Sequence, residues 1–502
     1  MKKITIYTLL LSIINFSCSD SFLSIVPKVN LSSNTFYKTD SDFIQAVNAA
    51  YAPLRSLHNN TSMLLVEQHS DNARYVRNPA FGATENQSNL ADFNVPTANG
   101  ITTNTNVLNY YRQSYLSITR ANQVLSLIDA ATITESVKKN VKGQALFLRS
   151  LAYLDLVRLF NKAPLQLIPI TGREDAAAPL ATAEQLYTQI IKDASEAATL
   201  LPDKATQEAG RATTGAASMV LANVYIIQKK WAEAETELKK IETSGKYSLM
   251  PTYADAFSTN NGNKNNKESV FEVQFLEGSA GLNGNFFYTM LPYPLTAPEL
   301  TTLTGTSNAQ GLSGEGNNVA TPELMESFET GDKRKADGWG TITASTVLHD
   351  NKVFPVAKKY AKTHALHNNH GTNWPIYRYA ETLLFMAEVM VEQNKLADAA
   401  TYINQIRTRA GLEPTKATSQ AELRAAVYQE RRVELAFESK RLYDLVRTGR
   451  FESTIKAYGE KVKADKARYY FPSTGFVPSD AFTNITPYYG LPADEAALSP
   501  NF

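Results

Sequence analysis

An internal repeat constrains the fold of this 502-residue chain more than any other feature. Residues 217–241 align without a gap with residues 382–406, at an offset of 165 positions. Each unit is predicted to form a helix, a turn of about three residues and a second helix, with one small alanine in each arm. Small side chains there let two antiparallel helices approach closely, as in a tetratricopeptide hairpin; the alternative is a coincidental pair of helical hairpins. The matched pairs include Ala222 with Ala387, Val224 with Val389, Lys230 with Lys395, Ala234 with Ala399, Leu238 with Ile403 and Ile241 with Ile406.

Helical spacing also dominates the first half of the chain. Apolar residues recur at intervals of three and four within residues 111–125, 145–159 and 187–201, which predicts three further helices. We therefore predict an all-α fold in the main. Tetratricopeptide-like hairpins would form a right-handed helical scaffold with long irregular loops and a few short strands.

The segment between the two repeat units has a different composition. Residues 258–267, 278–320 and 337–374 are rich in Gly, Asn and Thr, with aromatic or histidine residues among them. Loops of this length in a compact protein usually carry function. We expect the ligand to bind there.

Charge and motif content exclude several classes of protein. Fifty Lys and Arg residues meet 49 Asp and Glu residues, so there is no basic field to attract nucleic acid or anionic lipid heads. The chain lacks a His-Glu-x-x-His motif, a Gly-x-Ser-x-Gly elbow, a phosphate loop and a dinucleotide fingerprint. We predict no catalytic residue, no metal site and no cofactor, although a glycosidase needs only two carboxylates and stays an alternative.

The N-terminus has the layout of a bacterial lipoprotein signal. Two lysines follow Met1, residues 4–14 are almost entirely apolar, and Ser17 precedes Cys18, the one cysteine of the chain. The residue three before Cys18 is Asn15, where such signals usually have Leu. We predict cleavage before Cys18 and lipid attachment to Cys18. The alternative is a secreted protein without a lipid anchor, in which the Cys18 thiol is unmodified. No later apolar run reaches membrane length, so membrane contact would come through this lipid only.

Six stretches, in order along the chain, resemble the SusD/RagB family of outer-membrane nutrient-binding lipoproteins. Gly490-Leu491-Pro492 departs from the two prolines frequent in the family. The loops at 74–105 and 278–374 match nothing in it, so the resemblance does not identify the ligand. The six stretches are Ser70–Ala73, Tyr111–Asn122, Gly143–Leu165, Tyr377–Gly411, Glu430–Arg447 and Leu491–Asn501.

The resemblance implies a non-enzymatic protein on the outer face of the outer membrane. It would capture a nutrient oligomer and act as a lid on a SusC-like TonB-dependent channel. The usual cargo is an oligosaccharide and sometimes a peptide; a glycan-cleaving lipoprotein and a pure protein scaffold are the competing hypotheses. The chain would divide into a signal peptide (1–17), a lipidated tether (18–40), an N-terminal SusD-like helical region (41–255) and a C-terminal RagB/SusD region (256–502).

Candidate ligand contacts follow from the chemistry of sugars. A sugar ring packs on flat aromatic faces, and its hydroxyls pair with planar amide, carboxylate or guanidinium groups. The alternative for each aromatic residue is that it fixes its own loop to the scaffold. The candidates are Asp71, Asn72, Arg74, Tyr75, Arg77 and Phe81 in one loop, Phe286, Phe287, Tyr288 and Tyr293 in another, and Trp339 in a Gly-rich turn.

Two other clusters could bind a metal. Glu430, Glu434 and Glu438 share one helical ridge, but the interleaved arginines favour a partly buried Glu–Arg network. Histidines at 364, 367 and 370 recur every three residues. The Asn and Gly residues around them favour a polar loop over a metal site.

We predict that Cys18→Ala moves the protein from the membrane fraction to the soluble fraction, because lipid attachment would be lost. Fractionation of cells that lack the partner channel checks this. A mutant that still pellets with outer membranes would contradict the lipid assignment.

Overall fold

The structure of the protein is a computed structural model. The predicted signal peptide, Cys18, most of the tether, Arg77 and Phe81 lie outside the residues that it describes. Within the part described, no helix is long and apolar enough to cross a membrane. The described residues are 36–75, 90–94, 103–172, 175, 178–257, 263–311, 316, 318–345, 350–471 and 477–498.

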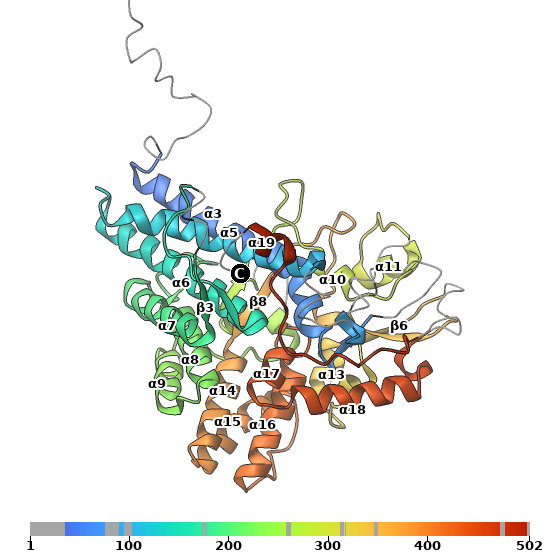
Figure 1. The fold of residues 1–502 in the computed structure, drawn as a ribbon. Coiled ribbons are helices and arrows are strands. Elements are labelled where there is room, and N and C mark those ends of the chain that lie inside the picture. The colour runs from blue at the N-terminus through green and yellow to red at the C-terminus, as the bar shows by residue number, and fades with distance from the viewer. Residues whose placement is uncertain are drawn as a thin grey trace, which may run out of the picture.

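The described residues are mostly helical, as predicted. Successive helices pack side by side in chain order and build a continuous frame (Figure 1). The three helices expected in the first half are present as α5, α6 and α7. The frame consists of α3 (Asp40–Ser56), α5 (Thr105–Ile128), α6 (Glu135–Phe160), α7 (Ala183–Leu200), α8 (Thr214–Ile227), α9 (Trp231–Thr243), α14 (Tyr379–Glu392), α15 (Leu396–Arg409) and α16 (Gln420–Glu434).

The repeat extends to backbone geometry. The helices α8 and α9 form one hairpin and α14 and α15 the other, and α9 packs directly against α14. Lys229 and Asn394, equivalent positions in the two turns, have φ values of 56° and 60°. The Lys230 N–H donates to the Tyr225 carbonyl and the Lys395 N–H to the Met390 carbonyl, both at 2.8 Å, which closes each first helix with the same cap. Whether the hairpins stack as in a tetratricopeptide array stays a prediction.

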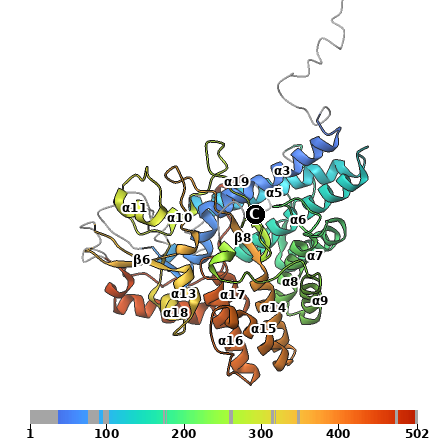
Figure 2. The ribbon, with the colours of Figure 1, turned by 180° about the vertical axis from the view of Figure 1, so that it is seen from behind.

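A long excursion separates α9 from α14, and a strand pair closes its base. Strand β4 (Ser269–Val273) pairs antiparallel with β8 (Trp374–Arg378), so the excursion leaves and rejoins the frame at one place. Figures 1 and 2 show α11 and β6 of this excursion on one side of the molecule and α7, α8 and α9 on the other.

The remaining elements are short. Two π-helical turns, η1 (Leu57–Thr61) and η2 (Met63–Glu67), continue α3. Three more antiparallel pairs join β1 (Ala73–Arg74) to β5 (Val319–Ala320), β2 (Lys162–Pro164) to β3 (Leu180–Thr182), and β6 (Gly340–Thr343) to β7 (Val353–Val356). The other helical segments are η5 (Ala254–Phe257), α10 (Phe286–Thr289), α11 (Ala297–Thr304), α12 (Pro322–Glu326), α13 (Lys333–Gly338), η7 (Lys358–Tyr360), α17 (Arg441–Arg447), α18 (Phe451–Ala464), η8 (Ala467–Tyr469) and α19 (Ala493–Leu498).

The small alanines of the hairpins give a testable prediction. Ala222 and Ala387 have no exposed surface, so Ala222→Leu or Ala387→Leu should overpack the helix contact and cost roughly 1–3 kcal/mol of stability. Ala232→Leu and Ala397→Leu, at exposed positions of α9 and α15, are the matched controls. Thermal unfolding decides: equal melting temperatures for buried and exposed variants would contradict close helix packing.

Candidate functional site

Three segments of the excursion lie against one another and form a surface that we call the loop platform, comprising residues 278–297, 305–311 and 364–371. Gly284 and His370 exchange two backbone hydrogen bonds of 2.8 and 3.0 Å. The His367 N–H donates to Asn308 Oδ1 at 2.7 Å. Hydrogen bonds from main-chain donors to main-chain and side-chain acceptors therefore join platform segments that are distant in sequence.

The first predicted loop is joined to this platform through β5. Ala73 pairs with Ala320 in the β1–β5 ladder, and the Thr321 N–H donates to the Asn72 carbonyl at 2.9 Å. Just before β5, the Asn318 N–H donates to the Thr289 carbonyl at 3.2 Å. Residues 71–75 and 286–291 are thus held by the same short strand.

The aromatic residues of the second loop fix the platform to the core. Phe286 packs edge-on against Trp374, with ring centroids 5.0 Å apart. The Tyr288 hydroxyl lies 2.7 Å from His364 Nε2, and the His364 Nδ1 lies 2.6 Å from the Lys362 carbonyl. A proton on Nδ1 would make Nε2 the acceptor from Tyr288. Phe286, Phe287 and Tyr288 are all buried.

The polar residues of the first loop are also engaged inside the protein. Arg441 donates to both carboxylate oxygens of Asp71, at 2.7 and 2.9 Å, and Arg432 Nε donates to Asn72 Oδ1 at 3.0 Å. Burial alone would raise the pKa of Asp71, but Arg441 and Arg432 hold it well below its usual range. Arg74 forms a buried ion pair with Asp92 at 2.5 Å.

Burial thus separates the predicted contact residues into two groups. Tyr75 and Tyr293 are partly exposed. Trp339 packs between Phe328 and Phe437 and is buried. Ligand contact by any of them stays a prediction, and burial argues against it for Asp71, Asn72, Arg74, Phe286, Phe287, Tyr288 and Trp339.

The amide groups on the platform were not among the predicted contact residues. Asn283, Asn308, Asn368 and Asn369 are all partly or fully exposed, with His367 among them. The density of Asn, Gly and His over 364–371 was the available signal. Although His364 and His367 pack against Tyr288 and His370 against His364, the described residues contain no group of His, Cys, Asp or Glu side chains that could hold a metal ion.

A buried ionic network, which we call the hub, ties the excursion to the frame through Glu430, Glu434 and Glu438. The predicted Glu–Arg network is present, but its cations are not those interleaved in sequence. Arg378 of β8 donates to Glu434 at 3.0 Å and to Glu438 at 2.8 and 2.9 Å. Arg334 of α13 donates to Glu430 at 2.8 Å, and Lys359 of η7 to Glu438 at 3.0 Å.

The hub keeps Glu434 ionised. Burial raises the pKa of Glu434, but Arg409, Arg378 and Arg334 outweigh burial and lower the pKa to about 2. For the nearby Glu67, at the end of η2, burial outweighs the neighbouring cations. Burial raises the pKa of Glu67 to about 7, despite opposing effects of Lys359 and the Phe437 amide. Neither carboxylate oxygen of Glu67 has a hydrogen-bond partner of ordinary geometry among the described residues.

Two family models match the sequence, one at each end. The model described as "SusD family" matches residues 351–501. The model described as "Starch-binding associating with outer membrane" matches residues 28–226. Between them, residues 227–350 are unmatched, a stretch that holds α9 and most of the excursion.

Relatives and solved structures cover nearly the whole chain. The "SusD-like protein P25" of Formosa agariphila is 26% identical over 100% of this chain and 97% of its own length. The solved SusD homolog of Bacteroides thetaiotaomicron has a TM-score of 0.75 at 20% identity, covering 94% of this chain and 97% of that one. Surface glycan-binding protein A from the same organism, in complex with laminarihexaose, has a TM-score of 0.71 at 23% identity, covering 92% and 98%.

Glu67 makes stability depend on pH. Its folded-state pKa of about 7 lies above the ordinary value of 4.5, so the stability that its proton contributes is complete below pH 4.5 and is lost as pH rises through 7. The Glu67→Gln variant has an uncharged side chain at this position at every pH. Its free energy of unfolding, relative to that of the wild type, should therefore rise by roughly 2 kcal/mol between pH 5 and pH 8. Urea unfolding at both pH values measures this. Glu233→Gln, at an exposed site on α9, is the control, and parallel pH profiles for Glu67→Gln and the wild type would contradict a protonated Glu67.

Proposed function

The chain belongs to the SusD/RagB family, and from that premise we propose that it binds an oligosaccharide at the loop platform and delivers it to a SusC-like TonB-dependent channel. The binding is non-catalytic. The protein acts at the outer surface of the outer membrane, anchored by the lipid on Cys18.

The observation that carries the binding proposal is the platform itself. It carries partly or fully exposed asparagines and the partly exposed ring of Tyr293, and hydrogen bonds between its segments hold it in place. Amides pair with neighbouring hydroxyls and a tyrosine ring stacks on a sugar face. Two solved relatives support the ligand class: one is in complex with laminarihexaose, and another is a laminarin-binding SusD-like protein.

The expected affinity is weak. A platform in open water makes few desolvated contacts, so we expect dissociation constants on the order of micromolar to millimolar. Weak binding suits a protein that must release its cargo.

An exposed aliphatic patch supports delivery to a membrane partner. Leu167, Ile168 and Ile170 follow β2, and Ile168 is 59% exposed. Asn122 of α5 donates to the Ile168 carbonyl at 3.3 Å. Asn122 itself lies about 9 Å along the helix axis from the end of α5. The short connection after α5 leads to Thr134, the N-cap of α6, whose N–H donates to Asp40 Oδ1 in the first turn of α3 at 2.8 Å. The patch thus lies near the segment from which the tether departs, within reach of a partner in the same membrane.

The platform gives a prediction on binding. Tyr293→Ala and Tyr75→Ala should each weaken oligosaccharide binding by about 1 kcal/mol or more while the melting temperature holds, since both side chains are partly exposed. Glycan and peptide arrays identify the ligand, and calorimetry measures the affinity.

Phe287→Ala is the contrasting variant. Its side chain is fully buried, so it should lose about 3–5 kcal/mol of stability. Unchanged affinity in both tyrosine variants would place the site elsewhere. Chromatography of the oligosaccharide after incubation should show no shortened product; turnover in independently purified protein would contradict the non-catalytic assignment.

The aliphatic patch gives a second prediction. Less β-barrel channel should co-purify with the double variant Ile168→Ser, Ile170→Ser from extracted membranes than with the wild type, because the apolar contact area is lost. Val353→Ser, at another exposed aliphatic site (52% exposed), is the control. Full recovery of the channel with the double variant would show that the patch is not the contact surface, and failure to recover any channel with the wild type would contradict delivery itself.

A further inference from the structure

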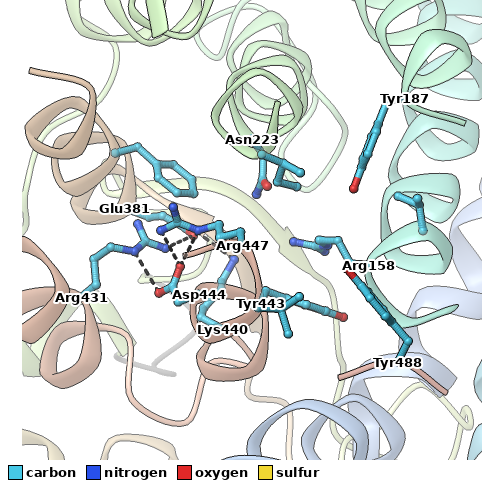
Figure 3. Close-up of a pocket in the computed structure, with 14 residues that line it drawn as sticks. Arg158, Tyr187, Asn223, Glu381, Arg431, Lys440, Tyr443, Asp444, Arg447 and Tyr488 are labelled. Carbon is cyan, nitrogen blue, oxygen red and sulfur yellow. Dashed lines mark hydrogen bonds and ion pairs between the residues drawn. The ribbon is translucent and has the colours of Figure 1, made fainter. Parts of the chain in front are cut away.

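A cavity of about 200 Å³ lies where α6, α7 and α8 meet α14, α16, α17 and the segment around Tyr488 (Figure 3). None of the platform residues lines it. It is smaller than the pockets of roughly 300–1,000 Å³ that hold drug-sized ligands. Its size suits one small molecule.

Four cations line this cavity, namely Arg158, Arg431, Lys440 and Arg447, against two acids, Glu381 and Asp444. Both acids are already engaged. Arg431 and Arg447 lie 2.9 and 2.7 Å from the carboxylate of Asp444, and Lys440 lies 2.9 Å from that of Glu381.

Arg158 faces this paired group from another helix. Figure 3 shows Arg158 and Asn223 pointing toward the middle of the cavity. Arg158 stacks on the Tyr443 ring, 3.9 Å from its centroid, and its Nη2 donates to Asp155. Within the described part of the chain, its buried Nε has no hydrogen-bond partner, and neither has the buried Nη1 of Arg431.

Two tyrosine hydroxyls complete the lining. Tyr187 and Tyr488 are both half-buried cavity residues. Burial raises the pKa of Tyr187 to about 12, so its hydroxyl stays protonated and can donate. The unused groups around the cavity are therefore mainly donors, and the strong acceptors are already occupied. A complementary ligand must supply acceptor oxygens of its own.

The count of charges limits how negative that ligand can be. Asp155 pairs with Arg158, and Glu388 pairs with Arg447 from behind the cavity wall. With Glu381 and Asp444 these acids balance the four cations. At most one negative charge therefore fits, because only the unpaired donors of Arg158 and Arg431 remain to stabilise it. Every further charge would be buried without a counter-ion.

We propose that this cavity binds one small hydroxylated carboxylate of monosaccharide size, such as a uronic acid, with its carboxylate against Arg158 and its hydroxyls at Tyr187 and Tyr488. The site is separate from the loop platform and does not depend on the platform binding oligosaccharides. The guanidinium of Arg158 can pair with two carboxylate oxygens at once, and the tyrosine rings cover the apolar part of the sugar.

Calorimetric titration of the intact protein with glucuronate, glucose and sulfate tests the proposal. We expect glucuronate to bind at least tenfold more tightly than either of the others. Equal binding of glucose would show that the carboxylate is not recognised, and equal binding of sulfate would show a general anion site; either result overturns the proposal, as does no binding of glucuronate.

Conservative variants locate the binding. Tyr187→Phe with Tyr488→Phe removes only the two hydroxyls, and Arg158→Lys keeps the charge but not the paired donors, so each should weaken glucuronate binding at least fivefold. Tyr225→Phe, on α8 but outside the cavity lining, should bind as the wild type does. Full binding by the cavity variants would overturn the assignment. The same variants should bind the platform oligosaccharide with wild-type affinity. A negative result at the cavity would therefore leave the proposed function of the platform untouched.

Discussion

The buried guanidinium of Arg378 and the three glutamates around it form the contact on which the rest of the structure depends. Arg378 is 2% exposed, and it contacts Glu268 before β4 as well as Glu434 and Glu438. A buried ion pair adds little net stability when complete, but loss of one partner costs about 3–5 kcal/mol because a charge is left uncompensated. The network therefore acts as a unit. Its members come from β8, α13 and η7 on the excursion and from α15 and α16 on the frame, so folding of the two parts is coupled.

This coupling explains how irregular loops can present a defined surface. The excursion between α9 and α14 leaves the frame at β4 and returns at β8, and the hub fixes both strands. Beyond that base, the Trp374 ring stacks on Tyr360 and meets Phe286 edge-on, so the aromatic residues of the platform point inward. The outer side is left to amides and partly exposed tyrosines. The helices on the other side of the molecule keep a separate, charged cavity.

Sequence reasoning succeeded where periodicity carries the information. The hairpins could be predicted because Ala222 and Ala234 recur as Ala387 and Ala399, and even the turn geometry at Lys229 and Asn394 repeats. The ridge of Glu430, Glu434 and Glu438 was recognisable from its spacing of four. Its partners were not, because Arg334, Arg378 and Arg409 are brought there by tertiary packing. For the same reason Phe286 and Tyr288 looked like ligand contacts: a loop sequence does not tell which face of an aromatic cluster meets the core. The family resemblance predicted the fold but not the ligand-contacting residues.

Hydrogen–deuterium exchange of the intact protein, with and without the oligosaccharide selected by a glycan array, tests most directly whether the platform binds the ligand. The account predicts slower exchange in peptides covering residues 278–297 and 364–371, where backbone amides carry the platform bonds. It predicts no change in the hairpins α8–α9 and α14–α15. Protection confined to the hairpins, or equal exchange everywhere under saturating ligand, would contradict the account.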